Sequence, residues 1–315
     1  MGCGIEIASL GVENQLKGNP LEVFHFQPIR IQPKPYLYSQ PKYLEMQYET
    51  LQISISGHIA EIAINRPDKA NCLTETAFRE LKSVMEEMDE NDEVRVVILH
   101  GHGKHFCAGI DLELLLSIGE KTKEACEGRK REKLRKLVLE LQAPINAVEA
   151  CRKPVLVAIQ GGCIGAGLDL AAACDMRYCT ADAFFTIKEI DLGMVADLGS
   201  LQRLPKLISP GLVNELAYTG RKMDAAEAEK SGLVNKAFSN KEEMLAELRK
   251  LAQMIASKSP LSIRGTKEVL LYARDHSVTE SLQQIALWNA AMILSEDLSV
   301  AGMAAVTKTE PKFRN

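Results

Sequence analysis

The sequence has little net charge and no long apolar run. Its 38 Lys and Arg residues nearly balance 42 Asp and Glu residues, so the net charge of the 315-residue chain is only −4. A protein whose whole surface holds nucleic acid or anionic lipid would be strongly basic, so any polyanionic ligand must be bound locally. The longest apolar stretches, such as Pro154–Gln160 and Ile164–Ala173, are too short to cross a bilayer. We therefore expect no membrane span and no nucleic-acid partner.

The chain also lacks the cysteine pattern of a disulfide scaffold or a metal centre. Its 8 cysteines form no Cys-x-x-Cys pair and no His-rich metal spacing. We expect reduced thiols in an intracellular compartment, and no metal site. With 46% hydrophobic, 25% charged and only 5% aromatic residues, the composition excludes a disordered tail and a collagen-like fibre. Its length suits one large domain or two smaller ones that could enclose a substrate pocket.

The first 45 residues differ from the rest of the chain. They contain 5 of the 12 prolines, and acidic residues interrupt them where a standard import presequence is poor in acids. We expect 1–45 to be an N-terminal extension, either a leader or disordered. The chain does not end in Ser-Lys-Leu, so neither end carries a clear organelle address.

Hydrophobic periodicity predicts a mixed α/β chain from residue 46 onward. Apolar residues alternate on both sides of Gly57, which predicts a β-hairpin, and Thr74 is placed to cap a helix that runs through Met88. We expect an α/β core over 46–240 and a helical region without strands over 241–315. Further strands are expected at 94–99, 155–159, 177–179 and 184–187, and further helices at 168–174, 201–207, 212–218, 241–257, 260–273 and 279–296.

A glycine-rich segment, 161–167, connects a predicted buried strand to an apolar helix. Its glycine spacing does not fit a dinucleotide-binding fold, and the chain has no Walker pattern. A turn of this kind leaves free N–H groups at the helix start, where they face a partial negative charge.

Three acidic residues stand among apolar residues and glycines: Asp169 inside the apolar helix, then Glu189, then Asp197. Taken alone, Asp169 is better explained as a helix-start acid stabilised by the helix dipole. Two further acids in similar surroundings favour a functional interpretation.

Four separated segments, in the same order, resemble the enoyl-CoA hydratase/isomerase (crotonase) superfamily. They are 106–112, 161–169, 183–189 and 193–205, and the similarity extends from about residue 48 to about residue 305. The resemblance implies an α/β crotonase fold, a spiral of repeated β-β-α units followed by a C-terminal helical trimerisation region. It also implies an acyl-CoA thioester substrate and a homotrimer or homohexamer.

The acids indicate the branch of the superfamily. Hydratases carry two glutamates, whereas this chain has Asp169 at the first position, Glu189 at the second, and Asp197 where hydratases typically have glycine. This set resembles Δ3,5-Δ2,4-dienoyl-CoA isomerase. The resemblance implies conversion of 3,5-dienoyl-CoA to 2,4-dienoyl-CoA by proton transfer between carbon 2 and carbon 6. That reaction belongs to the β-oxidation of unsaturated fatty acids in the mitochondrial or peroxisomal matrix.

The resemblance also assigns roles to the three acids. Glu189 is expected near carbon 2 and Asp197 near carbon 6, although the residue types leave the direction of each transfer open. Asp169 would orient or electrostatically tune this pair. No metal or redox cofactor is expected, because coenzyme A is part of the substrate.

The same resemblance assigns an oxyanion hole to the backbone amides of Ile110 and Ala166. The family often has a third glycine at position 166, but an alanine still supplies its amide. The other substrate-binding residues implied are Ala108, Gly109, Asp111 and Gly165.

Alternative functions stay open at this point. Enoyl-CoA hydration or Δ3-Δ2-enoyl-CoA isomerisation would leave Asp197 unexplained. A non-catalytic crotonase relative that binds RNA or acts as a scaffold is disfavoured by the complete acid set and the acidic net charge. Among the remaining residues, Arg203 is expected to anchor structure, and Lys267 and the cations of the charged segment before residue 136 are expected to neighbour the coenzyme A phosphates. Leu282, Ile285, Trp288 and Met292 form an apolar stripe that is assigned to the core or to an interface, with the core as the default.

Overall fold

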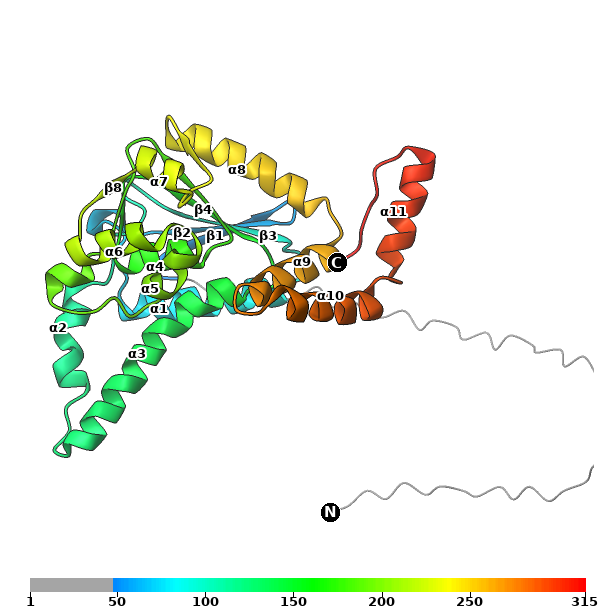
Figure 1. Cartoon of the computed structure of the whole chain (residues 1–315). Helices are drawn as coiled ribbons and strands as arrows, with labels where there is room; N and C mark the ends of the chain where they lie inside the picture. Colours follow the sequence, from blue (N-terminus) through cyan, green and yellow to red (C-terminus); the bar gives the residue numbers. More distant parts are fainter. Residues whose placement is uncertain (1–47) are drawn as a thin grey trace, which may run out of the picture. The chain divides into compact units, whose positions relative to one another are not determined.

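The described part of this computed structural model is residues 48–315, so the extension expected at 1–45 lies outside it. A six-stranded sheet forms its centre (Figure 1). The first two strands pair antiparallel across Gly57, which confirms the predicted hairpin, and the other pairs are parallel. In spatial order the strands are β1 (Leu51–Ser56), β2 (Ile59–Ile64), β3 (Val96–Gly101), β4 (Val155–Ile159), β6 (Met176–Thr180) and β9 (Lys236–Phe238).

A smaller second sheet includes part of the glycine-rich segment. Its order is β5 (Gly162–Ile164), β7 (Phe184–Thr186) and β8 (Met223–Asp224), with β5 and β7 parallel. The remaining helices between the strands are α1 (Glu75–Glu90), α2 (Leu112–Lys121), α3 (Glu127–Ala150), α4 (Ala166–Ala173), α5 (Ser200–Arg203), α6 (Pro210–Thr219) and α7 (Ala225–Ser231), with short 3-10 turns η1 (Pro67–Lys69), η2 (Glu189–Leu192) and η3 (Leu204–Lys206).

Helices cover both faces of the large sheet, so its central strands β3 and β4 are buried at every position. On β3, Val96 and Ile98 pack toward α8 (Lys241–Ala256), while Val97 and Leu99 belong to the cluster on the opposite face. Figure 1 shows α8 on one side of the sheet and α1, α3 and α4 on the other. Because both faces are buried, β4 and the first four residues of β3 are apolar runs without alternation.

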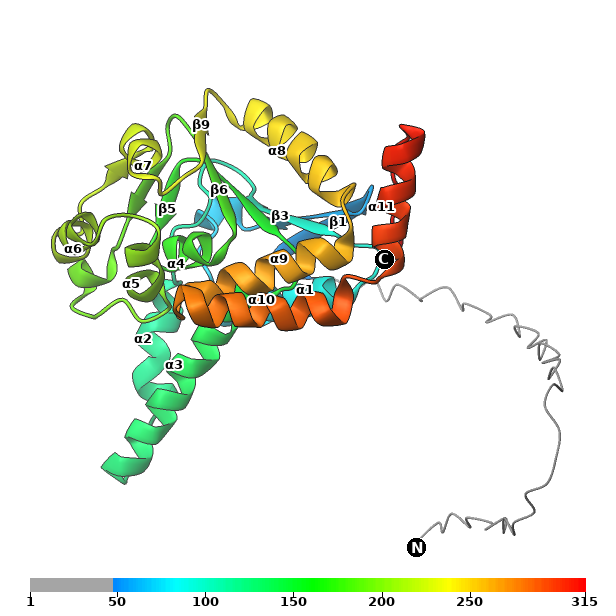
Figure 2. The same cartoon turned by 45° about the vertical axis from the view of Figure 1, so that its right-hand side comes forward.

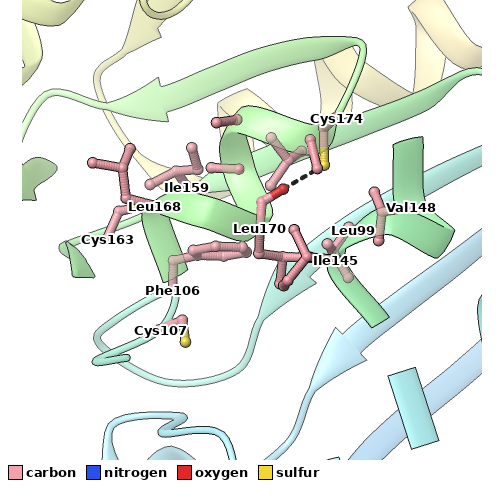
Figure 3. Close-up of a cluster of buried hydrophobic side chains, with 14 of the residues drawn as sticks. Leu99, Phe106, Cys107, Ile145, Val148, Ile159, Cys163, Leu168, Leu170 and Cys174 are labelled. Carbon is pink, nitrogen blue, oxygen red and sulfur yellow. Dashed lines mark hydrogen bonds between the residues drawn. The ribbon is translucent and has the colours of Figure 1, made fainter. Parts of the chain in front are cut away.

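The cluster beneath the sheet holds the helix that carries Asp169. Figure 3 shows Leu170 of α4 beside Ile145 and Val148 of α3, with Phe106 close by. Every residue of α4 is buried. The helix that follows the glycine-rich turn is therefore packed on all sides.

Local sequence signals explain where several helices begin. The Thr74 hydroxyl accepts a hydrogen bond from Ala77 N, as predicted for the start of α1, and Asp111 caps α2 by accepting from Glu113 N. Helices α2 and α3 project together from the body of the protein (Figure 2). Pro144 lies inside α3.

From Lys241 to Asn315 the described chain contains helices and no strand. After α8 come α9 (Pro260–Ala273), α10 (Val278–Met292) and α11 (Glu296–Thr307), and α9 and α10 lie side by side in Figures 1 and 2. Within 48–315, no single helix is long and apolar enough to cross a membrane. The pair α10 and α11 passes the length and composition criteria only together, with an 82° bend between them. The division into a core and a helical region at residue 240 stays a prediction.

The apolar stripe on α10 corrects one expectation. Leu282 is 61% exposed and Met292 is 38% exposed, whereas Ile285 and Trp288 are partly buried. The default assignment to the core was wrong for the two end members of the stripe, because α9 covers only part of the helix and nothing else in the described chain covers the rest. The alternative, an interface, stays a prediction for these two residues.

The sheet core generates a stability prediction. Leu156 is fully buried between the sheet and α8, so Leu156→Ala removes packed apolar volume and leaves a cavity. We expect a loss of about 2–5 kcal/mol in the free energy of unfolding, measured by urea denaturation. Leu116→Ala is the matched control, because Leu116 is 83% exposed on α2. Equal losses in the two variants would contradict the proposed layering.

Candidate active site

A deep pocket lies where the loop after β3 meets the start of α4 and the α2–α3 projection. Its volume is about 1840 Å³, including solvent at its mouth. The wall formed by α2 and α3 is mainly apolar, and apolar residues of the segment 192–198 extend it. These apolar side chains are Leu112, Leu115, Ile118, Leu134, Leu137, Val138, Leu141, Leu192, Met194 and Leu198.

The polar end of the pocket is built by two backbone segments that pair with each other. Cys107 N donates to Gly162 O at 3.1 Å, and Ile164 N donates to Cys107 O at 3.0 Å. A side chain at Gly167 would place its Cβ only 2.7 Å from Cys107 O, so glycine is required for this approach. The pairing brings the loop after β3 directly against the N-terminus of α4.

The two amides expected to form the oxyanion hole lie in these segments. Leu73 N donates to Gly109 O and Asp111 N donates to Leu73 O, which leaves Ile110 N outside that bridge. Ala166 N is at the first position of α4, where helix amides have no intrahelical acceptor. A Cβ on Gly109 would lie 3.7 Å from Ala166 N, so the two segments are in contact. Within 48–315, neither amide donates to another protein group.

All four predicted substrate-binding residues line this pocket, as do both residues expected to supply the oxyanion amides. The positions that share this lining are Ala108, Gly109, Ile110, Asp111, Gly165 and Ala166. Gly165 has φ = +50°, and a Cβ there would lie 3.0 Å from Glu189 Oε1. Glycine at 165 thus permits both the turn into α4 and the close approach of the Glu189 carboxylate.

Asp169 lies behind the pocket wall and is fully buried. Its Oδ1 accepts a hydrogen bond from Ser200 N, and its Oδ2 has no partner among the described residues. Burial, followed by the negative charge of Glu189, raises the pKa of Asp169 to about 7. The structure therefore brings Asp169 next to the other acids but not into the lining of the pocket.

Glu189 and Asp197 both line the pocket. Glu189 begins η2 just after β7, and its Oε2 is buried without a partner in the described chain. Its pKa is raised, first by burial and also by the charge of Asp197, and burial raises the pKa of Asp197 as well. Two carboxyls with raised pKa values, at the end of an apolar pocket, are groups that can donate and accept protons in general acid-base chemistry.

The segment that carries Asp197 is fastened to α3. Gln142 Nε2 donates to the main-chain oxygen of Asp197 at 2.6 Å. The buried guanidinium of Arg203 pairs with Glu149 at 3.0 Å and lies against Gly199. Arg203 is absent from the lining of the pocket, which confirms its expected structural role.

The mouth of the pocket contains cations that sequence reasoning missed. Arg66, Lys69 and Lys188 line it, and Arg66 forms an ion pair with Asp111 at 3.5 Å. The expectation for Lys267 was wrong. Its Nζ is buried, donating to Lys153 O and to Asp175 at 2.7 Å, and it does not line the pocket.

Cys107 and the nearby histidines act structurally. Cys107 is fully buried, and burial raises the pKa of its thiol to about 12, which disfavours the thiolate that a nucleophile requires. His105 Nδ1 accepts a hydrogen bond from Gly162 N and so supports the β5 turn.

The family model for enoyl-CoA hydratase/isomerase matches residues 54–315. The chain belongs to this family. Among curated relatives of the family, the Arabidopsis thaliana protein named Delta(3,5)-Delta(2,4)-dienoyl-CoA isomerase, peroxisomal, is 46% identical over 270 residues, covering 84% of this chain and 97% of the relative. The Homo sapiens protein named Delta(3,5)-Delta(2,4)-dienoyl-CoA isomerase, mitochondrial, is 45% identical over 267 residues, covering 84% and 81%. The expected mitochondrial or peroxisomal location agrees with these names.

Solved structures from the enoyl-CoA hydratase/isomerase family confirm the crotonase fold. An enoyl-CoA hydratase from Bacillus anthracis has a TM-score of 0.77 at 29% identity and covers 84% of this chain and 99% of its own. A second hydratase structure, from Geobacillus kaustophilus, has a TM-score of 0.75 at 30% identity, covering 85% and 98%.

The burial of Asp169 generates a prediction about pH. Its carboxyl has a pKa of about 7 in the folded chain against an ordinary value of 3.8. The stability it contributes is therefore fully present below pH 3.8 and is lost as the pH rises through 7. Asp169→Asn keeps an oxygen for Ser200 N but cannot ionise. Between pH 4.5 and 7.5 the variant should gain about 3 kcal/mol relative to wild type.

The measurement is urea unfolding of both proteins at the two pH values. Any change in packing that the amide introduces is independent of pH and cancels in this comparison. A constant difference between variant and wild type would show that Asp169 ionises normally in the folded protein.

Proposed function

We propose that this chain isomerises 3,5-dienoyl-CoA to 2,4-dienoyl-CoA in the β-oxidation of unsaturated fatty acids, in a mitochondrial or peroxisomal matrix. The observation that carries the proposal is the third acid. Asp197 lines the apolar pocket together with Glu189, with Asp169 buried behind them. Five curated relatives at 44–46% identity are named for this activity, which supports the same assignment.

The chemistry requires an acid or base at each end of a conjugated system. In a 3,5-dienoyl thioester, carbon 2 is acidified by the carbonyl and the adjacent diene, so loss of its proton gives a dienolate delocalised to carbon 6. Return of a proton at carbon 6 yields the conjugated 2,4-diene. In our assignment Glu189 removes the proton at carbon 2 and Asp197, in its carboxylic acid form, delivers one to carbon 6.

The raised pKa values of Glu189 and Asp197 suit these two roles. Glu189 and Asp197 repel each other when both are ionised, and both are partly withdrawn from water. Each carboxyl therefore holds a proton more readily than it would in water. Asp169, which does not line the pocket, is coupled to the pair by charge, since Glu189 and Asp197 raise its pKa, and we assign it the role of tuning the pair from behind.

The developing thioester oxyanion is assigned to the amides of Ile110 and Ala166. Both amides lack a protein acceptor within the described chain, and their segments are in contact. One such donor is worth about 3–4 kcal/mol in the transition state. The proposed reaction uses no metal or redox cofactor, since coenzyme A enters as part of the substrate.

Hydration is the second candidate, because the matched structures include enoyl-CoA hydratases. It leaves Asp197 without a role in an apolar pocket. A non-catalytic scaffold would have no use for two buried carboxyl oxygens without partners, those of Asp169 and Glu189.

The activity prediction uses two substrates and three variants. With 3,5-octadienoyl-CoA, wild type should generate conjugated-diene absorbance, and Glu189→Gln or Asp197→Asn should each lower kcat by about 10²- to 10⁴-fold, the usual contribution of a general acid or base. Asp191→Asn is the matched control, because Asp191 is exposed and does not line the pocket. Efficient hydration of crotonyl-CoA without any diene product would overturn the assignment.

We also propose that the protein is a homotrimer or a hexamer of two trimers. Leu282, Leu287 and Leu294 lie exposed on and just after α10, so a single chain leaves an apolar surface in water. The expected result is a trimeric or hexameric mass by size-exclusion chromatography with light scattering. A monomeric mass would contradict the proposal.

A further inference from the structure

A second cavity lies on the other side of the segment that carries Asp197. Its volume is about 690 Å³, including solvent at its mouth. Asp197 and Leu198 line both this cavity and the acyl pocket. We call it the polar chamber, and its other lining residues are Gln142, Asn146, Glu149, Gly199, Gln202, Arg203, Lys206, Arg274 and Asp275.

The two cavities differ in chemistry. Leucine, isoleucine and valine side chains dominate the acyl wall of the pocket, whereas the polar chamber is lined mainly by amide and charged groups. The charged groups are satisfied by one another: Glu149 pairs with Arg203 and Arg274, and Lys206 pairs with Asp275. Such a lining holds water through hydrogen bonds, while an acyl chain favours the apolar side.

The three acids differ in their access to the polar chamber. Glu189 lines only the acyl pocket, and Asp169 lines neither cavity. Asp197 is partly exposed, and within 48–315 its carboxylate accepts no hydrogen bond from another residue. Asp197 is thus the one acid of the three that borders both cavities.

The wall between the two cavities is held firmly in place. The bond from Gln142 Nε2 fixes the main chain at Asp197, and Arg203 packs against Gly199 two residues later. Access from the polar chamber to Asp197 is therefore a property of the folded chain and needs no opening of the acyl pocket.

We propose that the polar chamber is the route by which the proton on Asp197 exchanges with water while the acyl pocket is occupied. The inference rests on the proposed function. In each turnover one acid gains the proton of carbon 2 and the other loses a proton to carbon 6, so the pair must be reset. Asp197 takes a proton from water through the chamber, and Glu189 returns its proton to water as product leaves. No proton is consumed overall, and if the two acids exchange roles the same route carries the proton outward.

The test follows the hydrogen that starts on carbon 2. A 3,5-octadienoyl-CoA deuterated at carbon 2 is converted in ordinary water at saturating concentration, and the deuterium at carbon 6 of the product is measured by mass spectrometry. Wild type should place water-derived hydrogen at carbon 6. Deuterium retained at carbon 6 in wild type would overturn the proposal, because it would mean direct transfer between Glu189 and Asp197.

The plugging variant is Gln202→Trp. Gln202 is exposed, lines the chamber and is not part of the proposed catalytic set. Added bulk there should lower kcat severalfold, because Asp197 regains a proton from water more slowly. Gln253→Trp is the matched control. Gln253 is exposed on α8 and lines neither cavity, so this variant should behave as wild type. Lys206→Trp places similar bulk in the chamber from η3 if the first variant does not fold.

The outcomes separate the two proposals. Wild-type kcat in a folded plugging variant would refute the role of the chamber and leave the isomerase assignment intact. Absence of conjugated diene from wild type would refute the proposed function itself.

Discussion

The site depends on one close approach, between the loop after β3 and the turn from β5 into α4. Two backbone hydrogen bonds join Cys107 to β5, and glycine at 109 and 167 removes the side chains that would hold the segments apart. This approach brings the segments of Ile110 and Ala166 into contact, as the proposed oxyanion hole requires. Burial of Phe106 and of every residue of α4 then supports the pairing from behind.

The three acids are costly to hold within this apolar packing. An ionised carboxylate in an apolar interior is destabilising unless it is hydrogen-bonded or paired, and Asp169 has only one backbone donor, from Ser200. No cation balances Glu189 or Asp197 among the described side chains. The fold tolerates this cost because the surrounding core is extensive, and the raised pKa values that result are the property that proton transfer requires.

Sequence reasoning predicted elements that have a clear period or cap, and it missed the strands β5 and β9 and several helices. The hairpin around Gly57 and the helix capped by Thr74 were evident from alternation and capping. β5 and β9 have three residues each, too few to show a period, and their pairing comes only from tertiary contacts. Helix α2 also escaped prediction.

The same limit applies to the site. The three acids and the oxyanion segments were assigned from local motifs that resemble the family, and their roles stay predictions. The apolar wall, the cations at the mouth and the position of Asp169 behind the lining depend on which segments meet in space. Lys267 shows the opposite error, a residue that was assigned to the site but lies outside it. Its charge suggested a phosphate partner, but its side chain is buried against Asp175.

The projection of α2 and α3 has a consequence for how such a protein can diversify. These two helices supply most of the wall against which an acyl chain would lie, whereas Glu189, Asp169 and the oxyanion amides come from elements on the body of the protein. In the proposed assignment, the residues that contact the acyl chain and those that transfer protons are thus separate in the chain. Gln142 and Glu149 of α3 connect the two parts through Asp197 and Arg203. Substitutions along the projection can change which thioester fits while the proton-transfer groups keep their positions.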